Sequence, residues 1–213
     1  MSRVVLATRN AGKVVELRRI LTGVELVGLD AYPGMPEVEE TGDTFAANAL
    51  LKARAVAAFT GLPAVADDSG LCVDFLGGAP GIRSARWAGE PSDDAANLAS
   101  VLEQLADAGE GLRGAHFFCA AAAVVPGSGE RVAEGRVDGT LLAAPRGTNG
   151  FGYDPIFVPV GETRTTAEMS SEEKDAISHR GAAFRALAPS LAALLRIGAR
   201  EGSRTPTPEG TGS

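Results

Sequence analysis

The chain has 213 residues, of which 45% are hydrophobic and 22% are charged. These values are typical of a folded globular protein and exclude collagen-like, coiled-coil and wholly disordered classes. The formal net charge of −7 makes general binding to a nucleic-acid backbone unfavourable, so we expect no nucleic-acid partner. One hydrophobic core can serve a chain of this length.

The cysteines and the apolar runs indicate the cellular compartment of the protein. Cys72 and Cys119 each lie within an apolar stretch, where we expect buried free thiols rather than a disulfide. The longest apolar run, 117–125, is much shorter than the roughly 20 residues of a membrane-spanning helix. Residues 1–10 become polar too early for a signal peptide. The sequence therefore predicts a cytoplasmic protein without a membrane partner.

The first third of the chain alternates strand and helix signals. A β-branched run predicts a strand, a glycine-containing loop follows it, and apolar residues at helical spacing then predict a helix. A second strand, a loop rich in proline, glycine and acidic residues, and an alanine-rich helix that ends at a glycine come next. The two strands cover residues 4–8 and 24–29, the two loops 9–13 and 31–43, and the two helices 14–21 and 44–59.

The rest of the chain adds a hairpin and further helices. Residues 62–70 predict a strand that ends in two aspartates and a turn, and 70–89 predict mostly irregular structure. We expect a helix over 92–109 capped by Ser92, and two strands, 115–125 and 131–142, joined by a turn. A glycine-rich loop then leads into a strand ending near 159, and Ser170 marks the start of the C-terminal helices. This order predicts an α/β fold with a mixed sheet, followed by a disordered tail, 201–213.

Residues 8–13, TRNAGK, stand between the first strand and the first helix. The segment differs from a Walker A motif, which needs an earlier glycine and a Ser or Thr after the lysine. Backbone amides at a helix N-terminus with Lys13 in the first turn nevertheless suit a phosphate group. The alternative is an ordinary surface lysine after a turn.

Acidic residues gather at two places. Glu39 and Glu40 precede the second helix, and Asp67 and Asp68 follow an apolar strand. Buried carboxylates need a cation or hydrogen bonds, and Mg²⁺ favours one or two carboxylates together with phosphate oxygens and water. A capped turn over 67–70 is the alternative. Four residues separate Asn48 from Lys52, so both lie on one helix face, turned either to solvent or to the anion site.

Two segments could bind a purine base. Phe151 lies between glycines, which would let its ring stack on a base, although a turn with core aromatics is the alternative reading. His179 and Arg180 supply hydrogen-bond donors just before the last helix, and Lys174 lies upstream. A phosphate loop, metal-binding carboxylates, a stacking ring and base-edge donors together indicate a nucleoside triphosphate hydrolase.

Five segments in order resemble the inosine/xanthosine triphosphate pyrophosphatases, which cleave dITP, ITP and XTP to the monophosphate and pyrophosphate. They are TRNAGK, EETGDTFAANALLKA, ADDSGLCVDFLGGAPGIRSARWAG, GFGYDPIF and SEEKDAISHRGAA, and the resemblance spans about residues 3–195. It implies one two-lobed domain over 1–200, built on an elongated mixed sheet with a central cleft. It also implies a Mg²⁺-dependent homodimer.

The resemblance implies a role for each matched residue. Asp68 would be the general base, and Glu40 and Asp68 would bind Mg²⁺. The residues implied to bind substrate are Thr8, Arg9, Asn10, Ala11, Gly12, Lys13, Lys52, Ser69, Phe151, Gly152, Tyr153, Asp154, Lys174, His179 and Arg180.

The chain departs from the family pattern at three places. Arg9 replaces a residue that is often small, Asn149 interrupts a usual Gly-Gly pair, and RVDG (136–139) lacks a common Trp-Pro. None of these changes removes an implied ligand. Two alternatives to the family reading stay open: a related nucleotide pyrophosphatase with another base specificity, and a nucleotide sensor without turnover.

Overall fold

The computed structural model describes residues 2–201 and contains one six-stranded mixed sheet with the strand order β2-β1-β3-β4-β5-β6. The strands are β1 (Arg3–Leu6), β2 (Glu25–Val27), β3 (Ala64–Val73), β4 (Gly114–Val125), β5 (Gly129–Leu141) and β6 (Phe157–Pro159). The α-helices are α1 (Ala11–Ile20), α2 (Phe45–Thr60), α3 (Asp94–Gln104), α4 (Ser171–Ile177) and α5 (His179–Glu201). Six short 3-10 helices are η1 (Leu29–Ala31), η2 (Asp74–Leu76), η3 (Gly81–Arg86), η4 (Glu110–Leu112), η5 (Asp154–Ile156) and η6 (Thr166–Glu168).

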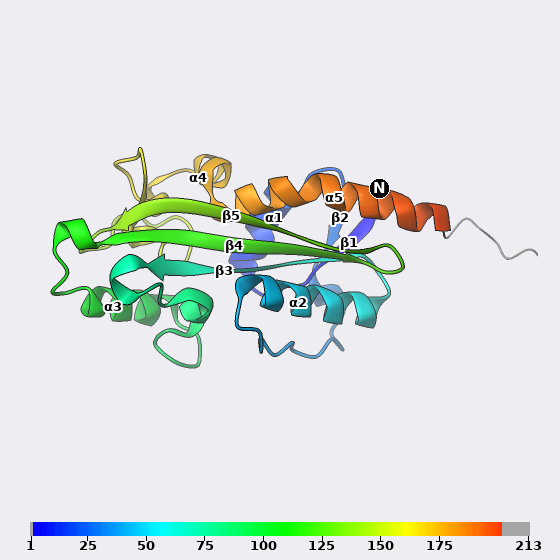
Figure 1. The fold of residues 1–213 in the computed structure, drawn as a ribbon, viewed down its shortest axis with the longest axis horizontal. Helices are drawn as coiled ribbons and strands as arrows, with labels where there is room; N and C mark the ends of the chain where they lie inside the picture. Colours follow the sequence, from blue (N-terminus) through cyan, green and yellow to red (C-terminus); the bar gives the residue numbers. More distant parts are fainter. Residues whose placement is uncertain (1, 202–213) are drawn as a thin grey trace, which may run out of the picture.

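Strand directions change in the middle of the sheet. β1 runs parallel to β2 and to β3, whereas β3, β4, β5 and β6 form antiparallel pairs. The long strands β3, β4 and β5 extend along the molecule, and the shorter β1 and β2 lie at one end of it (Figure 1). The expected α/β fold with an elongated mixed sheet is confirmed.

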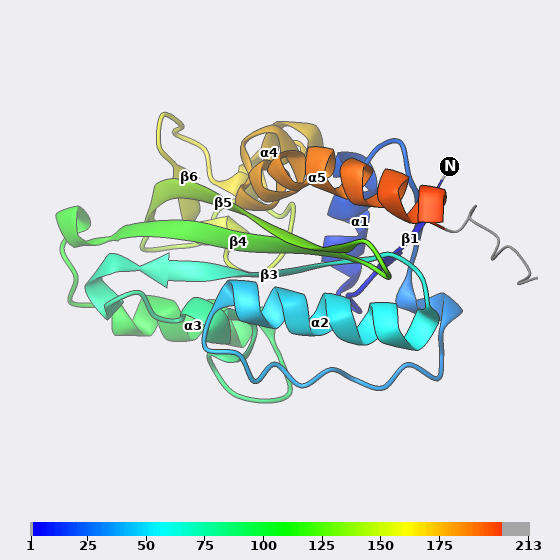
Figure 2. The ribbon, with the colours of Figure 1, turned by 45° about the vertical axis from the view of Figure 1, so that its right-hand side comes forward.

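Helices cover the sheet from opposite sides. α1 and α5 pack against one face through Leu17, Phe184 and Leu187, while α2 packs against the other face through Ala53 and Val56. Figure 2 shows α5 and α2 on opposite sides of β4. A further cluster joins α3 to the far halves of β3 and β4 and to β6. The prediction of a single two-lobed domain over 1–200 stays a prediction.

Several local sequence signals are confirmed. Gly61, with φ of 68°, ends α2. Ser170 forms a capping box with Glu173 at the start of α4, and the expected hairpin is β4 and β5. Cys72 and Cys119 are free and buried.

Two expectations about the middle of the chain are wrong. β3 does not end at the aspartates but continues as a strand through Asp67 and Asp68 to Val73. Gly70 therefore makes no turn: a Cβ there would overlap the Gly81 carbonyl and the Ser84 hydroxyl, so the glycine lets η3 pack directly on β3. Helix α3 begins after Asp93, whose side chain accepts from the Ala96 amide, rather than after Ser92.

Helix α5 meets the length and hydropathy criteria of a membrane-spanning helix over His179–Ala199, and 28% of that stretch is buried. The criteria use length and composition alone, and a helix in a protein core can satisfy them. Ala183, Phe184, Leu187 and Leu191 of α5 pack against β-strand residues in a hydrophobic core. The expected disordered tail falls on 201–213, of which 202–213 lie outside the described residues.

Candidate active site

The candidate site lies at the carboxyl end of β1. From β1 the chain passes through α1 to β2 on one face of the sheet, and from β2 it passes through α2 to β3 on the other face. In open α/β sheets such a change of side leaves a crevice at the strand ends, where ligands bind. β1 pairs with β3 only at Ala64 and Val65, so β3 continues past the end of β1 and along this crevice.

A cavity of about 290 Å³ occupies the crevice. Nearly all residues expected at the site line it, although they are spread along the chain from Thr8 to Arg180. Those lining residues are Thr8, Arg9, Asn10, Lys13, Glu40, Lys52, Asp68, Ser69, Phe151, Gly152, Tyr153, Asp154, Lys174, His179 and Arg180. Ala11 and Gly12 are the exceptions. Gly12 packs against Phe151, since a Cβ at this position would come within 2.7 Å of the ring.

The loop over residues 8–13 is held by its own side chains. The Asn10 side chain caps α1 by accepting from the Lys13 amide at 3.0 Å, and the Thr8 hydroxyl accepts from the Asn10 amide. Arg9 donates to the Met35 carbonyl at 2.7 Å and so fastens this loop to the segment before α2. The loop therefore presents the N-terminus of α1, with two basic side chains beside it, to the cavity.

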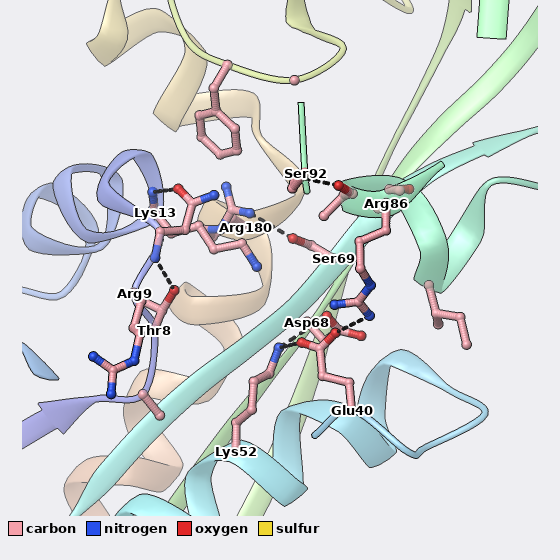
Figure 3. A pocket seen from close by; sticks show the side chains of 18 of the residues that line it. Thr8, Arg9, Lys13, Glu40, Lys52, Asp68, Ser69, Arg86, Ser92 and Arg180 are labelled. Atoms are coloured by element: carbon pink, nitrogen blue, oxygen red, sulfur yellow. Dashed lines mark hydrogen bonds and ion pairs between the residues drawn. The ribbon is translucent and has the colours of Figure 1, made fainter. Parts of the chain in front are cut away.

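Glu40 and Asp68 face each other across Lys52 (Figure 3). The Lys52 ammonium lies 2.7 Å from Glu40 Oε1 and 3.2 Å from Asp68 Oδ1. The buried Asn48 amide donates to the other oxygen of Asp68, and Arg86 donates to the other oxygen of Glu40. Both carboxylates are thus oriented by neighbours on α2 and η3.

The adjacent aspartates Asp67 and Asp68 have pKa values shifted in opposite directions. Burial raises the pKa of Asp68; Lys52 opposes that shift and the Glu40 carboxylate adds to it. Burial also acts to raise the pKa of Asp67, but Lys13 and Arg180 outweigh it and hold that pKa below its usual range. Two carboxyl groups whose pKa values are driven apart commonly divide charge stabilisation and proton transfer between them.

The donor set suits a magnesium ion. Among residues 2–201 no group of three or more histidine, cysteine or acidic side chains is arranged to hold a metal alone. Glu40 and Asp68 offer two carboxylates at the cavity wall, and Mg²⁺ commonly takes one or two with substrate phosphates and water. Burial is the largest influence that raises the pKa of Asp68, whereas Lys52 and Arg86 outweigh burial at Glu40 and lower the pKa of that carboxyl.

The other end of the cavity surrounds Phe151. Gly150 and Gly152 both adopt positive φ, and the Phe151 amide donates to Asp154. Lys174 and Arg180 lie 5.1 and 5.7 Å from the centre of the Phe151 ring. Two cations beside an aromatic face are arranged as in cation–π pairs.

Buried acidic residues fix these cations. Lys174 lies 2.6 Å from Asp154 Oδ2 and 2.8 Å from Glu16 Oε1. The second oxygen of Glu16 accepts from Arg180. Burial acts to raise the pKa of Glu16, but Arg180 and Lys174 outweigh it and lower that pKa. Each nitrogen of Arg180 bonds to a protein group, so only its remaining N–H bonds on the two Nη atoms can reach a ligand.

His179 is held by stacking. Its ring lies parallel to that of Phe117, with the centroids 4.8 Å apart. Burial, reinforced by the charges of Arg180 and Lys174, lowers the pKa of His179 well below the usual value. A neutral imidazole has one donor and one acceptor nitrogen for a ligand.

Several residues at the site were missed by the sequence reasoning. They are Glu16, Arg86 and Asp94; the last accepts from the Gly152 amide at 2.9 Å. Asn48 and Asp67 were singled out in the sequence but given no role at the site. Glu16 did carry a signal, because a carboxylate three residues after Lys13 falls on the same helix face among apolar positions. Arg86 and Asp94 carried none, because only the packing of η3 and α3 brings them to the cavity.

The chain is similar to known proteins over most of its length. The sequence profile of the Ham1 family matches residues 4–190. A dITP/XTP pyrophosphatase of Streptomyces avermitilis is 64% identical over 199 residues, which cover 92% of this chain and 100% of that protein.

Two solved structures are also similar. The Ham1 protein of Staphylococcus aureus matches with a TM-score of 0.80 and 39% identity, over 90% of this chain and 98% of that one. A nucleoside-triphosphatase / dITP/XTP pyrophosphatase of Mycobacterium abscessus matches with a TM-score of 0.71 and 54% identity, over 89% and 98% of the two chains. The family profile and these relatives extend over most of the sequence, and the chain therefore belongs to the Ham1 family.

Proposed function

We propose that the protein is a Mg²⁺-dependent nucleoside triphosphate pyrophosphatase that hydrolyses dITP, ITP and XTP to the monophosphate and pyrophosphate. This activity would keep non-standard purines out of DNA and RNA. The names of the similar relatives support the reaction and the substrate class. One observation carries the proposal: a single cavity has an aromatic ring with donors at one end and carboxylates with lysines at the other.

In this proposal the phosphates bind at the end formed by the loop over 8–13. The α1 N-terminus, Lys13 and Lys52 would hold the phosphate oxygens and offset the charge that develops during cleavage. Asp68 would accept the proton of the attacking water, since burial raises the pKa of its carboxyl. Glu40 and Asp68 would hold Mg²⁺, which when bound neutralises phosphate charge and acidifies a bound water.

The purine would stack on Phe151 and be read by His179 and Arg180. The free N–H bonds of Arg180 can donate to the 6-oxo group of hypoxanthine or xanthine, whereas the 6-amino group of adenine would leave them unpaired. Lys174 and Asp154, which bond to each other beside Phe151, complete this end of the cavity. Ser69, Gly152 and Tyr153 also line the cavity and would contact the substrate.

The resemblance to the pyrophosphatases extends the proposal to the state and place of the enzyme. We infer a homodimer, which light scattering coupled to size exclusion would detect as twice the 21.7 kDa chain mass. We also infer a cytoplasmic enzyme, because its nucleotide substrates are present there. Its partners would be purine nucleoside triphosphates alone.

A nucleotide panel tests the function. Pyrophosphate and phosphate release would be measured from dITP, ITP, XTP, dGTP, dATP and dUTP, each with Mg²⁺ and with EDTA. We expect metal-dependent pyrophosphate release from the first three and slow turnover of dATP. Equal turnover of all the nucleotides would contradict the base-reading role of His179 and Arg180. Tight dITP binding without turnover would instead favour a nucleotide sensor.

A further inference from the structure

One oxygen of Asp67 accepts from two cations, a hydroxyl and, at 3.9 Å, the Cys119 thiol. Its side chain is buried, with a relative exposure of 1%, and lies outside the cavity lining. Asp67 Oδ2 lies 3.0 Å from Lys13 Nζ and 3.1 Å from Arg180 Nε. The same oxygen accepts from the Ser69 hydroxyl at 3.0 Å. Asp68, the next residue, shares none of these contacts, because its side chain leaves the opposite face of β3.

The two cationic donors on Asp67 come from distant parts of the chain and have different roles in the proposed function. Lys13 belongs to the loop and helix at the phosphate end, whereas Arg180 belongs to α5 at the purine end. Both side chains lie on the same side of β3 in Figure 3, which labels Lys13, Arg180 and Ser69, and the strand offers one buried anion to both. Asp67 Oδ1 has no hydrogen-bond partner within the described part of the chain. The whole carboxylate therefore acts on Lys13, Arg180 and Ser69 through Oδ2.

We propose that Asp67 is a positioning residue that holds Lys13 and Arg180 together, so that phosphate binding and purine reading depend on one buried carboxylate. The inference rests on the proposed function and adds the residue that links the two halves of its site. A buried charge fixes its partners strongly, because its neighbours cannot exchange it for water. Without it, Lys13 loses its only ion-pair partner among the described residues, while Arg180 keeps Glu16 and the Ser69 hydroxyl.

The test separates the two ends of the site with two probes that need no turnover. Binding of tripolyphosphate, with Mg²⁺, and of inosine would be measured by calorimetry for the wild type and for Asp67→Asn. The substitution keeps an acceptor oxygen and removes the charge. We expect the Kd of both probes to rise about tenfold, as for the loss of one charge-assisted hydrogen bond. For dITP, KM should rise by more than kcat falls, because Asp67 does not reach the reacting atoms.

Asp175→Asn is the matched control. Asp175 is also buried, pairs with an arginine, Arg19, and has one carboxylate oxygen without a partner among the described residues. Arg19 lies outside the cavity lining, whereas the partners of Asp67 belong to it. We expect this variant to bind both probes within about twofold of the wild type, the usual effect of a change away from a site.

Wild-type affinity of Asp67→Asn for either probe would overturn the proposal, whether or not kcat falls. If Asp67→Asn does not fold, Lys13→Met is tested in its place. Inosine should then bind about threefold more weakly to this variant, because Asp67 would pair with Arg180 but no longer with Lys13. Unchanged inosine affinity in that variant would overturn the link. Failure of the wild type to hydrolyse dITP would reject the proposed function and leave the binding comparison standing.

Discussion

The pKa values of single residues at this site depend on the buried charges that surround them. Asp67 and Asp68 are neighbours in sequence and nearly equally buried, yet the pKa of one falls and that of the other rises. Asp67 contacts Lys13 and Arg180, whereas Asp68 shares Lys52 with a second carboxylate, Glu40. Chemical role therefore follows from strand alternation, which sends the two side chains to different partners.

His179 gives a prediction about pH and stability. Its pKa in the folded protein lies well below its usual value, so protons bind to this residue more readily in the unfolded chain. The free energy of unfolding must then fall as the pH drops below about 6.5. Between pH 7.5 and 5.5 this residue should account for about 1.4 kcal/mol of the loss.

Urea unfolding of the wild type and of His179→Gln at both pH values measures this contribution. The variant should lose about 1.4 kcal/mol less than the wild type over that interval. His116→Gln is the comparison. Burial lowers the pKa of His116 as well, but this side chain is only partly buried, so its substitution should remove less of the pH dependence than His179→Gln. Equal losses in the wild type and in His179→Gln would contradict a neutral, buried His179.

At the scale of elements, the purine end depends on how closely α5 approaches β5. A Cβ on Gly135 of β5 would overlap the His179 carbonyl and the Ala183 amide. Glycine therefore lets the first turn of α5, which carries His179 and Arg180, lie directly on the sheet. The overlapping atoms belong to the helix backbone, so they could not shift without moving the whole first turn of α5.

We expect Gly135→Ala to displace the first turn of α5. Unfolding measurements should show a loss of about 1–3 kcal/mol, the usual cost of overpacking. The kcat/KM for dITP should fall about tenfold or more, because the base donors move. Gly109→Ala is the control, since Gly109 has open space around a Cβ and an ordinary φ of −60°. Wild-type activity in Gly135→Ala would show that this contact does not position His179 and Arg180.

Local elements were predictable where the signal was local. The cap at Ser170, the glycine stop of α2 and the hairpin were all read from neighbouring residues. The course of β3 was not, because two aspartates normally end a strand and here are stabilised by cations from α1, α2 and α5. The site residues followed from motif resemblance, while Arg86 and Asp94 depended on packing that spacing alone does not encode.

For the molecule as a whole, one sheet connects all parts of the cavity wall. β1 leads into the loop over 8–13, which we propose binds phosphate, β3 carries both aspartates, and the chain beyond β5 supplies Phe151 and the last helices. The matched family profile ends at residue 190, and the cavity lining ends at Arg180. Everything proposed to bind or react therefore precedes the last part of α5.

Removal of residues 202–213 should leave the activity unchanged. We expect kcat/KM for dITP within about twofold of the full chain, because no residue proposed to act lies beyond Arg180. A steady-state comparison of the truncated and full-length proteins provides the measurement. A large loss of kcat/KM would show that residues 202–213 contribute to activity and would contradict this expectation.

The most direct test of the account is pyrophosphate release from dITP by the wild type and by Asp68→Asn. We predict one pyrophosphate per dITP and no free phosphate for the wild type. Asp68→Asn should retain nucleotide binding and lose about 100-fold or more in kcat, as for the loss of a general base. Asp43→Asn, at an exposed aspartate before α2, should behave as the wild type. Phosphate as the product, or a near wild-type rate in Asp68→Asn, would contradict the account.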